Sequence, residues 1–259
     1  MSSTSPTSSS KAGSAAQRSG LLLGSLGAAV RFAVTTRAGG VSRAPYDTLN
    51  LSTAVGDDPI AVAENRRRVK ASCGLRSVCF QYAEHGAHIE EIDFPRASAA
   101  ADPVADGMVT TVPGVGLAAL AGDCVPFAVT DVGGGVVAVG HCGWRGLLAG
   151  VVEAVVDAVR VRAKGPLLAA IGPAICSACY PVGEDVAARV VAKVPAAAVR
   201  TPEGRPALDL RAGVDAELGL RGVEVTRVVA GCTYEDPRFF SHRRDGRTGR
   251  HALLAWLEA

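Results

Sequence analysis

The stretch from Val78 to His141 most constrains the fold, because it is divided into short apolar runs typical of strands. The runs are IEEI, MVTTV, VGLAAL, VPFAVTD and VVAVGH, and glycine, proline and aspartate separate them. Apolar runs this short between turn residues match buried strands better than helices. We therefore expect this stretch to form the central sheets, with GPLLAAIGP and VEVTRVVA adding further strands.

Helical periodicity dominates the second half of the chain. The segment LLAGVVEAVVDAVRVRA repeats apolar residues at helical spacing and predicts a helix that opens just after Trp144, Arg145 and Gly146. Two more helices are expected at VGEDVAARVVAKV and LDLRAGVDAELGL, and DDPIAVAENRRRVKASCG reads as an earlier capped helix. Strands cluster first and helices follow, so the prediction is an α+β (mixed α/β) single domain. Its mixed β-sheets would be flanked by helices in a layered, cysteine-hydrolase-like architecture.

The expected domain boundary lies near residue 28. Residues 1–28 are rich in serine, alanine and glycine and are interpreted as a disordered tail, with 29–259 as the catalytic domain. The apolar patch LLLGSLGAAV follows Lys11 and Arg18, but it is interrupted and lacks a clean cleavage site, which disfavours a signal peptide. Seven scattered cysteines favour a reducing cytoplasm, and no uninterrupted apolar run predicts a membrane span.

Charge and familiar motifs exclude several function classes. The formal net charge is only +2, with 20% charged residues, so nothing indicates a nucleic-acid binder. Neither a P-loop, a G-x-G-x-x-G fingerprint nor a G-x-S-x-G elbow is present. Function must therefore depend on a local site.

The candidate metal ligands are His85, Cys124 and His141. Only five histidines exist, and these three residues lie in turns or at the ends of expected strands. Three dispersed ligands form no specific motif, so simple packing of a buried cysteine or histidine stays open. Their neighbours Asp123 and Cys142 would point to the opposite face of a strand.

A second cysteine pair, Cys176 and Cys179, has the spacing of half a zinc site or of a thiol redox motif. No second C-x-x-C accompanies it, which favours packing under the neighbouring turn.

Arginines in glycine-rich turns are the candidate anion ligands. Arg37 and Arg145 lie in such turns, and Arg243 and Arg244 belong to SHRRDGRTGR. The helix expected after Arg145 would offer free N–H groups to a phosphate or carboxylate. A solvated basic loop is the alternative for SHRRDGRTGR.

Taken together, TRAGGVSRAPYDTLNLS, EHG, GDCVPF, GHCGWRGLLAG, IGPAI and SHRRDGRTGR resemble the laccase-domain family in order and spacing. Members of that family are labelled polyphenol oxidase, purine nucleoside phosphorylase or peptidoglycan editing factor. The resemblance implies a metal site at His85, Cys124 and His141 and phosphorolysis of adenosine, inosine and methylthioadenosine. It also implies deamination of adenosine to inosine.

The implied ligand set makes chemical sense for zinc. Three protein ligands with an open fourth position are typical of a catalytic zinc, which can activate water for attack on C6 of adenine. Phosphorolysis would need Arg37, Arg145 and Arg243 or Arg244 to hold phosphate. The chain departs from the family at Ala83 and Glu84, where Glu84 could orient His85 or simply face solvent.

Three rival functions stay open. A His₂Cys set with Met108 as a distant axial ligand could hold copper and oxidise phenols, although the chain has too few histidines for a multicopper centre. Cys124 could instead be a metal-free nucleophile that edits peptidoglycan precursors. A non-catalytic binding protein is the third possibility. In each case we expect a monomer with small-molecule partners.

Overall fold

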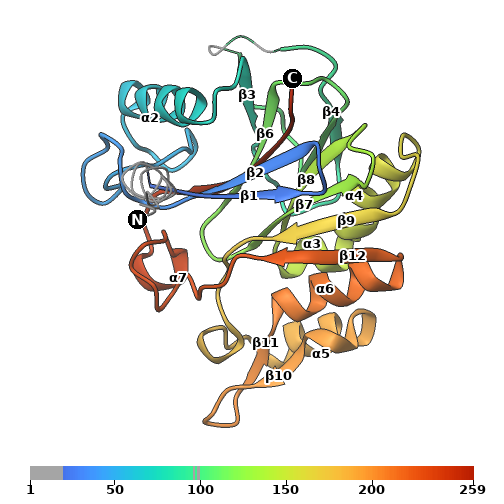
Figure 1. Ribbon diagram of the computed structural model, residues 1–259. Coiled ribbons are helices and arrows are strands. Elements are labelled where there is room, and N and C mark those ends of the chain that lie inside the picture. The colour runs from blue at the N-terminus through green and yellow to red at the C-terminus, as the bar shows by residue number, and fades with distance from the viewer. Residues whose placement is uncertain (1–19, 96, 98–99) are drawn as a thin grey trace, which may run out of the picture.

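Two β-sheets packed face to face form the centre of the computed structural model, which describes residues 20–95, 97 and 100–259 (Figure 1). The five-stranded sheet has the order β1 (Leu21–Leu26), β2 (Val30–Thr35), β13 (His251–Leu257), β6 (Val115–Ala121) and β3 (Ser77–Phe80). The six-stranded sheet has the order β12 (Val223–Val228), β9 (Leu167–Ile171), β7 (Val125–Asp131), β8 (Val137–Cys142), β5 (Gly107–Thr110) and β4 (Ile89–Glu91).

Both sheets are mixed. The pairs β3–β6, β4–β5 and β9–β12 are parallel, and the other neighbouring strands of these sheets are antiparallel. A separate two-stranded sheet joins β10 (Ala198–Arg200) to β11 (Pro206–Leu208). This confirms the expected mixed α+β class.

Helices cover the outer faces of the two sheets (Figure 1). Helix α2 (Pro59–Ser72) packs on the five-stranded sheet. The six-stranded sheet is covered by α3 (Trp144–Ala149), α4 (Val151–Arg160) and α6 (Leu210–Leu220). Helix α5 (Glu184–Lys193) packs against α3 and β11. A four-residue helix, α7 (His242–Asp245), and two 3₁₀ turns, Ser177–Cys179 and Pro195–Ala197, complete the chain.

Strand β13 shows why the layers hold together. Leu253, Ala255 and Leu257 face the core between the two sheets, and the alternate residues Leu254 and Trp256 face the core near α2. A strand buried on both faces reads as a continuous apolar run instead of an alternating one. The sequence analysis did not identify HALLAWL as a strand, although it lies in the middle of the five-stranded sheet.

Two expected boundaries are wrong. The tail expected through residue 28 ends earlier, because β1 pairs with β2 from Leu21 to Leu26 and the side chains of Leu21 and Leu26 are buried. Residues 1–19 lie outside the described part of the chain. The long helix expected after Gly146 begins instead at Trp144 and breaks at Gly150, whose φ of 86° ends α3 in the left-handed region.

Helix α2 begins as its sequence predicts. The carboxylate of Asp58 accepts a hydrogen bond from the Ile60 N–H, and Pro59 occupies the first helical position. Among the described residues, no helix is long and apolar enough to cross a membrane.

Candidate metal centre and active site

The three predicted ligands come together although they are distant in sequence. His85 lies between β3 and β4, Cys124 lies between β6 and β7, and His141 is the next-to-last residue of β8. Their ligand atoms all lie within 4.8 Å of one another, and Cys124 Sγ is 4.0 Å from His85 Nε2. The two imidazole rings meet edge to face with centroids 4.9 Å apart. The cluster can hold a metal ion.

Asp106, which the sequence analysis missed, holds both histidines in place. Its carboxylate accepts hydrogen bonds from the backbone N–H of His85 at 2.6 Å and of Gly86 at 2.8 Å. These bonds keep His85 in a left-handed turn with φ of 65°. The Asp106 carbonyl accepts from the His141 N–H at 2.8 Å. Its sequence signal was an aspartate and a glycine placed just before an expected strand.

The ligand set fits a metal ion. His141 is 4% exposed, and within the described residues its Nδ1 has no hydrogen-bond partner, since the nearest Asp106 oxygen is 3.9 Å away. Gly143 has no side chain, and this leaves room for Cys124 and His85 to lie close together. A Cβ at this position would lie only 2.9 Å from Cys124 Sγ. Two imidazoles and one thiolate are donors that suit Zn²⁺ or copper.

The cluster also favours the ionised form of the thiol. Burial by itself would raise the pKa of Cys124, but the charge and hydrogen bonding of His141 and His85 lower it to about 6. Burial likewise opposes the charged form of His141, and the neighbouring Cys124 and Asp106 nevertheless raise its pKa to about 9. The thiolate is the form of cysteine that binds a metal ion. The imidazole binds the ion after it has lost its proton.

The neighbours of the ligands point elsewhere, as expected. Cys142 is buried in the core beneath α3 and α4. The carboxylate of Asp123 accepts hydrogen bonds from Thr233 Oγ1 at 2.7 Å and from the Arg243 N–H at 2.6 Å. Asp123 therefore ties the segments around Thr233 and α7 to the metal-binding loop.

A cavity of about 460 Å³ opens beside the three ligands, a volume typical of small-molecule sites. Arg145 and Arg243 line it, and each guanidinium lies over an aromatic ring that also lines it. The Arg145 guanidinium is 4.5 Å from the centroid of Trp144, and that of Arg243 is 4.7 Å from the centroid of Tyr180. Stacking restricts both long side chains, and Arg243 Nη1 also donates to the Pro181 carbonyl at 3.0 Å.

Arg250 also lines the cavity, although it was not among the predicted anion ligands. Burial lowers the pKa of its guanidinium below the ordinary value. Of the two acidic residues in the lining, Asp102 forms a two-point ion pair with Arg66, with both N–O distances 2.7 Å, and Asp123 is occupied as described. The cavity therefore presents an excess of positive charge.

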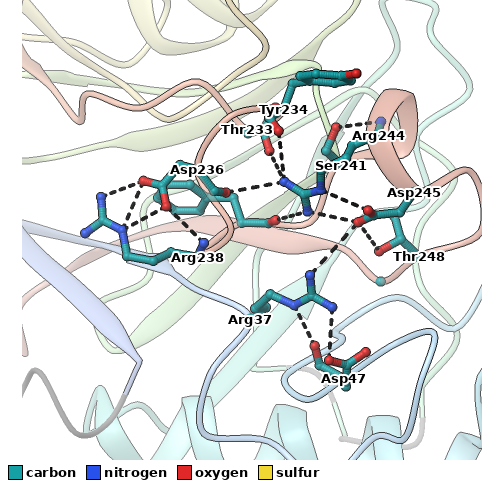
Figure 2. Close-up of polar contacts among 12 residues, drawn as sticks. Arg37, Asp47, Thr233, Tyr234, Asp236, Arg238, Ser241, Arg244, Asp245 and Thr248 are labelled. Atoms are coloured by element: carbon teal, nitrogen blue, oxygen red, sulfur yellow. Dashed lines mark hydrogen bonds and ion pairs between the residues drawn. The ribbon is translucent and has the colours of Figure 1, made fainter.

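Arg37 and Arg244 lie outside the lining of this cavity. Figure 2 shows the polar contacts that they make instead. Arg37 donates to the Asp47 carbonyl at 2.7 Å and pairs with its carboxylate at 3.1 Å. Arg244 donates to the carbonyls of Thr233 and Phe239 and to the carboxylate of Asp245. Its guanidinium is used to fasten the 233–245 segment, so the structure does not bring these two arginines to the site.

Two other expectations are settled by position. Met108 is fully buried between the sheets and does not line the cavity, so it is not an axial ligand. Glu84 is exposed and is likewise outside the lining, which leaves Ala83 as the cavity residue at this departure from the family pattern.

Comparison with known proteins identifies the family of the chain. The family described as multi-copper polyphenol oxidoreductase laccase matches residues 31–258. A purine nucleoside phosphorylase of Mycobacterium tuberculosis is 42% identical over 242 residues, which cover 91% of this chain and 95% of the relative. A purine nucleoside phosphorylase of Streptomyces griseus is 42% identical over 231 residues, covering 88% and 94%.

Solved structures share the fold over nearly the whole chain. A crystal structure of a Neisseria meningitidis protein of the DUF152 family superposes with a TM-score of 0.82 at 34% identity, covering 93% of this chain and 100% of that one. YlmD from Geobacillus stearothermophilus superposes with a TM-score of 0.78 at 31% identity, covering 90% and 93%.

Proposed function

The chain belongs to the multi-copper polyphenol oxidoreductase laccase family, and from this premise we propose that it is a zinc-dependent purine nucleoside phosphorylase. One observation carries the proposal most directly. Two arginines stacked on aromatic rings line the same cavity as the cluster of His85, Cys124 and His141. The names of the two actinobacterial relatives support the same activity.

His85, Cys124 and His141 would hold the ion, with Asp106 fixing the orientation of both histidines. A bound zinc ion would supply Lewis-acid polarisation at the floor of the cavity. The chain's own contribution is a rigid donor set, because Cys124 directly precedes β7, His141 belongs to β8, and these two strands are paired.

Phosphate recognition would fall to Arg145 and Arg243, with Arg250 behind them. Phosphorolysis joins a phosphate oxygen to C1′ of the nucleoside while the bond from C1′ to the base nitrogen breaks. Negative charge must therefore be held at the phosphate and at the departing base. Guanidinium groups suit this task because they bind phosphate oxygens with two parallel hydrogen bonds.

Tyr180 and Trp144 would form the walls against which a purine nucleoside lies. Burial, followed by the nearby Cys124, raises the pKa of the Tyr180 phenol to about 12, so it stays a neutral hydroxyl that can donate a hydrogen bond. Trp144 already carries Arg145 on its ring and offers its remaining edge to the cavity.

The substrates we propose are adenosine, inosine and methylthioadenosine, with deamination of adenosine as a second reaction at the same centre. We also propose that residues from about 20 to 259 act as one catalytic domain, in a monomer in the reducing cytoplasm. None of the seven cysteines, all of them in the described part of the chain, forms a disulfide, which supports that compartment.

The decisive experiment incubates zinc-loaded protein with each nucleoside and phosphate and measures free base and ribose 1-phosphate. Replacing Arg145 by alanine should raise the KM for phosphate about 10- to 100-fold, because a charge-assisted hydrogen bond is lost. Arg189→Ala is the matched control, since Arg189 lies 5.7 Å over the same Trp144 ring but outside the cavity lining. Its KM for phosphate should not change.

Other products would point to other functions. Inosine formed from adenosine without phosphate, and only with metal present, supports the deaminase reaction. Absence of ribose 1-phosphate from all three nucleosides would refute phosphorolysis. Oxidation of phenols by copper-loaded protein in that case would restore the oxidoreductase alternative.

A further inference from the structure

A second cluster of metal-binding side chains lies outside the cavity. Cys176, Cys179, Cys232 and Glu235 each offer one ligand atom, and these four atoms lie within 4.8 Å of one another. All three thiols are free and half-buried, and Glu235 is exposed. The sequence analysis saw only the C-x-x-C pair, because Cys232 follows it by more than fifty residues.

The backbone positions these thiols much as metal-binding turns do. Cys176 and Cys179 bracket the 3₁₀ turn Ser177–Cys179, in which the Cys179 N–H donates to the Cys176 carbonyl at 3.1 Å. A C-x-x-C turn of this kind directs both sulfurs to one side. The Cys176 N–H donates to Cys232 Sγ at 3.2 Å, a contact that stabilises charge on that sulfur.

An isolated β-bridge places Cys232 beside the turn. Ala174 and Cys232 pair in parallel just beyond the ends of β9 and β12, which holds residue 232 beside the start of the turn. Glu235 is three residues further on, and its carboxylate accepts from Cys179 Sγ at 3.5 Å. The fourth ligand atom thus closes the cluster on its exposed side.

We propose that Cys176, Cys179, Cys232 and Glu235 bind a second, structural zinc ion. A tetrahedral zinc with Zn–S bonds of about 2.3 Å holds its sulfurs roughly 3.8 Å apart, which the cluster accommodates with small side-chain shifts. Three thiolates select a soft or borderline ion, and the carboxylate oxygen favours Zn²⁺ over Cu⁺. Four protein ligands leave no open position, so this ion would not bind substrate.

The proposed site would fix the position of a segment that lines the cavity. Tyr180, which lines the cavity, directly follows Cys179. Thr233 directly follows Cys232, and its hydroxyl donates to the Asp123 carboxylate. The Thr233 carbonyl accepts from Arg244 (Figure 2). An ion shared by the two segments would hold the 174–180 turn against the 231–235 segment and so fix Tyr180 relative to the metal-binding loop.

The test compares metal content in full-length protein that has been reduced and stripped of metal, and then titrated with zinc and with cobalt(II). The double variant C176S/C179S should bind one equivalent fewer than the wild type. It should also lose most of the sulfur-to-cobalt charge-transfer absorption, since three of the metal-binding thiolates belong to this cluster and one to the other. Cys73→Ser, at the end of α2 and outside both clusters, is the matched control and should match the wild type.

A second measurement uses the unaltered chain. Zinc in excess of both clusters should protect Cys176, Cys179 and Cys232 together from alkylation, read peptide by peptide by mass spectrometry, while alkylation of Cys73 stays independent of zinc. Glu235→Gln, an exposed substitution, should weaken this protection about tenfold.

The difference of one equivalent does not depend on the proposed function, because it holds whether or not His85, Cys124 and His141 also bind metal. Equal metal content in the wild type and C176S/C179S would overturn the proposal. So would a disulfide among the three cysteines whose reduction restores no metal binding.

Discussion

Gly143→Ala tests the geometry of the metal centre with the smallest possible change. An alanine Cβ at this position would lie 2.9 Å from Cys124 Sγ and 3.2 Å from His85 Cδ2. Non-bonded heavy atoms pack best at about 3.5–4.0 Å, so the sulfur must move by roughly 0.6–1 Å. Gly143 has φ of −93° and ψ of −177°, a conformation open to alanine, and backbone strain therefore does not contribute.

We expect a large effect on metal affinity, because a metal site tolerates only small displacements of its ligand atoms. Ligand distances must stay within about 0.2 Å of their ordinary values, so displacement of Cys124 and His85 should weaken zinc binding about 10- to 100-fold. Overpacking should lower the free energy of unfolding by about 1–3 kcal/mol. Zinc affinity is measured by competition with a chromophoric chelator, and stability by denaturant unfolding of the metal-free protein.

Gly219→Ala is the matched control. Gly219 is exposed on α6, and no described atom lies within 4 Å of a Cβ built there. This variant should keep full zinc affinity and gain up to about 1 kcal/mol of stability from the better helix propensity of alanine. Equal zinc affinity in the wild type and Gly143→Ala would refute the interpretation that Gly143 makes room for the metal ligands.

Three further predictions concern other parts of the same framework. Asp106→Asn should weaken zinc binding about tenfold and lower the free energy of unfolding by about 1–3 kcal/mol. The reason is that the asparagine amide cannot accept both hydrogen bonds that the carboxylate accepts from the backbone N–H groups of His85 and Gly86. Unchanged zinc affinity would contradict this. Burial, followed by the charge of Arg250, lowers the pKa of His251 from 6.5 to about 3, so the unfolded chain binds more protons between these pH values. Stability should therefore fall as the pH drops through that window, by up to about 5 kcal/mol, and His251→Leu should remove this part of the pH dependence in denaturant unfolding. Arg244→Ala should lower the unfolding temperature, since the guanidinium donates hydrogen bonds to the carbonyls of Thr233 and Phe239. The KM for phosphate should change by less than about threefold. A large rise in that KM would indicate that Arg244 does bind phosphate.

Most of the fold was predictable because the signals for strands and helix caps are local. The expected runs correspond to β4 to β9, and Asp58 with Pro59 marked the start of α2 as predicted. The unpredicted strands include the short strands β3, β10 and β11 as well as β1 and β13. Strand β13 is buried on both faces, so it lacks the alternation by which a half-buried strand is recognised.

Some of the candidate functional residues could be chosen from local features of the sequence, and others could not. His85, Cys124 and His141 could be chosen because few histidines exist and because strand ends are where rigid scaffolds present their side chains. The arginines could not be sorted, since a long flexible side chain takes whichever partner packing places within reach. Arg145 lines the cavity, and Arg244 is held by backbone carbonyls only a few residues away along the chain.

The sequence by itself indicated most of the strands and helices and selected His85, Cys124 and His141 as candidate ligands, because periodicity, turn chemistry and rarity of histidine are properties of the chain alone. Only the tertiary structure decided that Asp106 holds both histidines and that Cys232 and Glu235 join the C-x-x-C turn. These contacts join residues from about twenty to almost sixty positions apart in sequence. Their physical cause is the pairing of distant strands, which no local pattern in the sequence records.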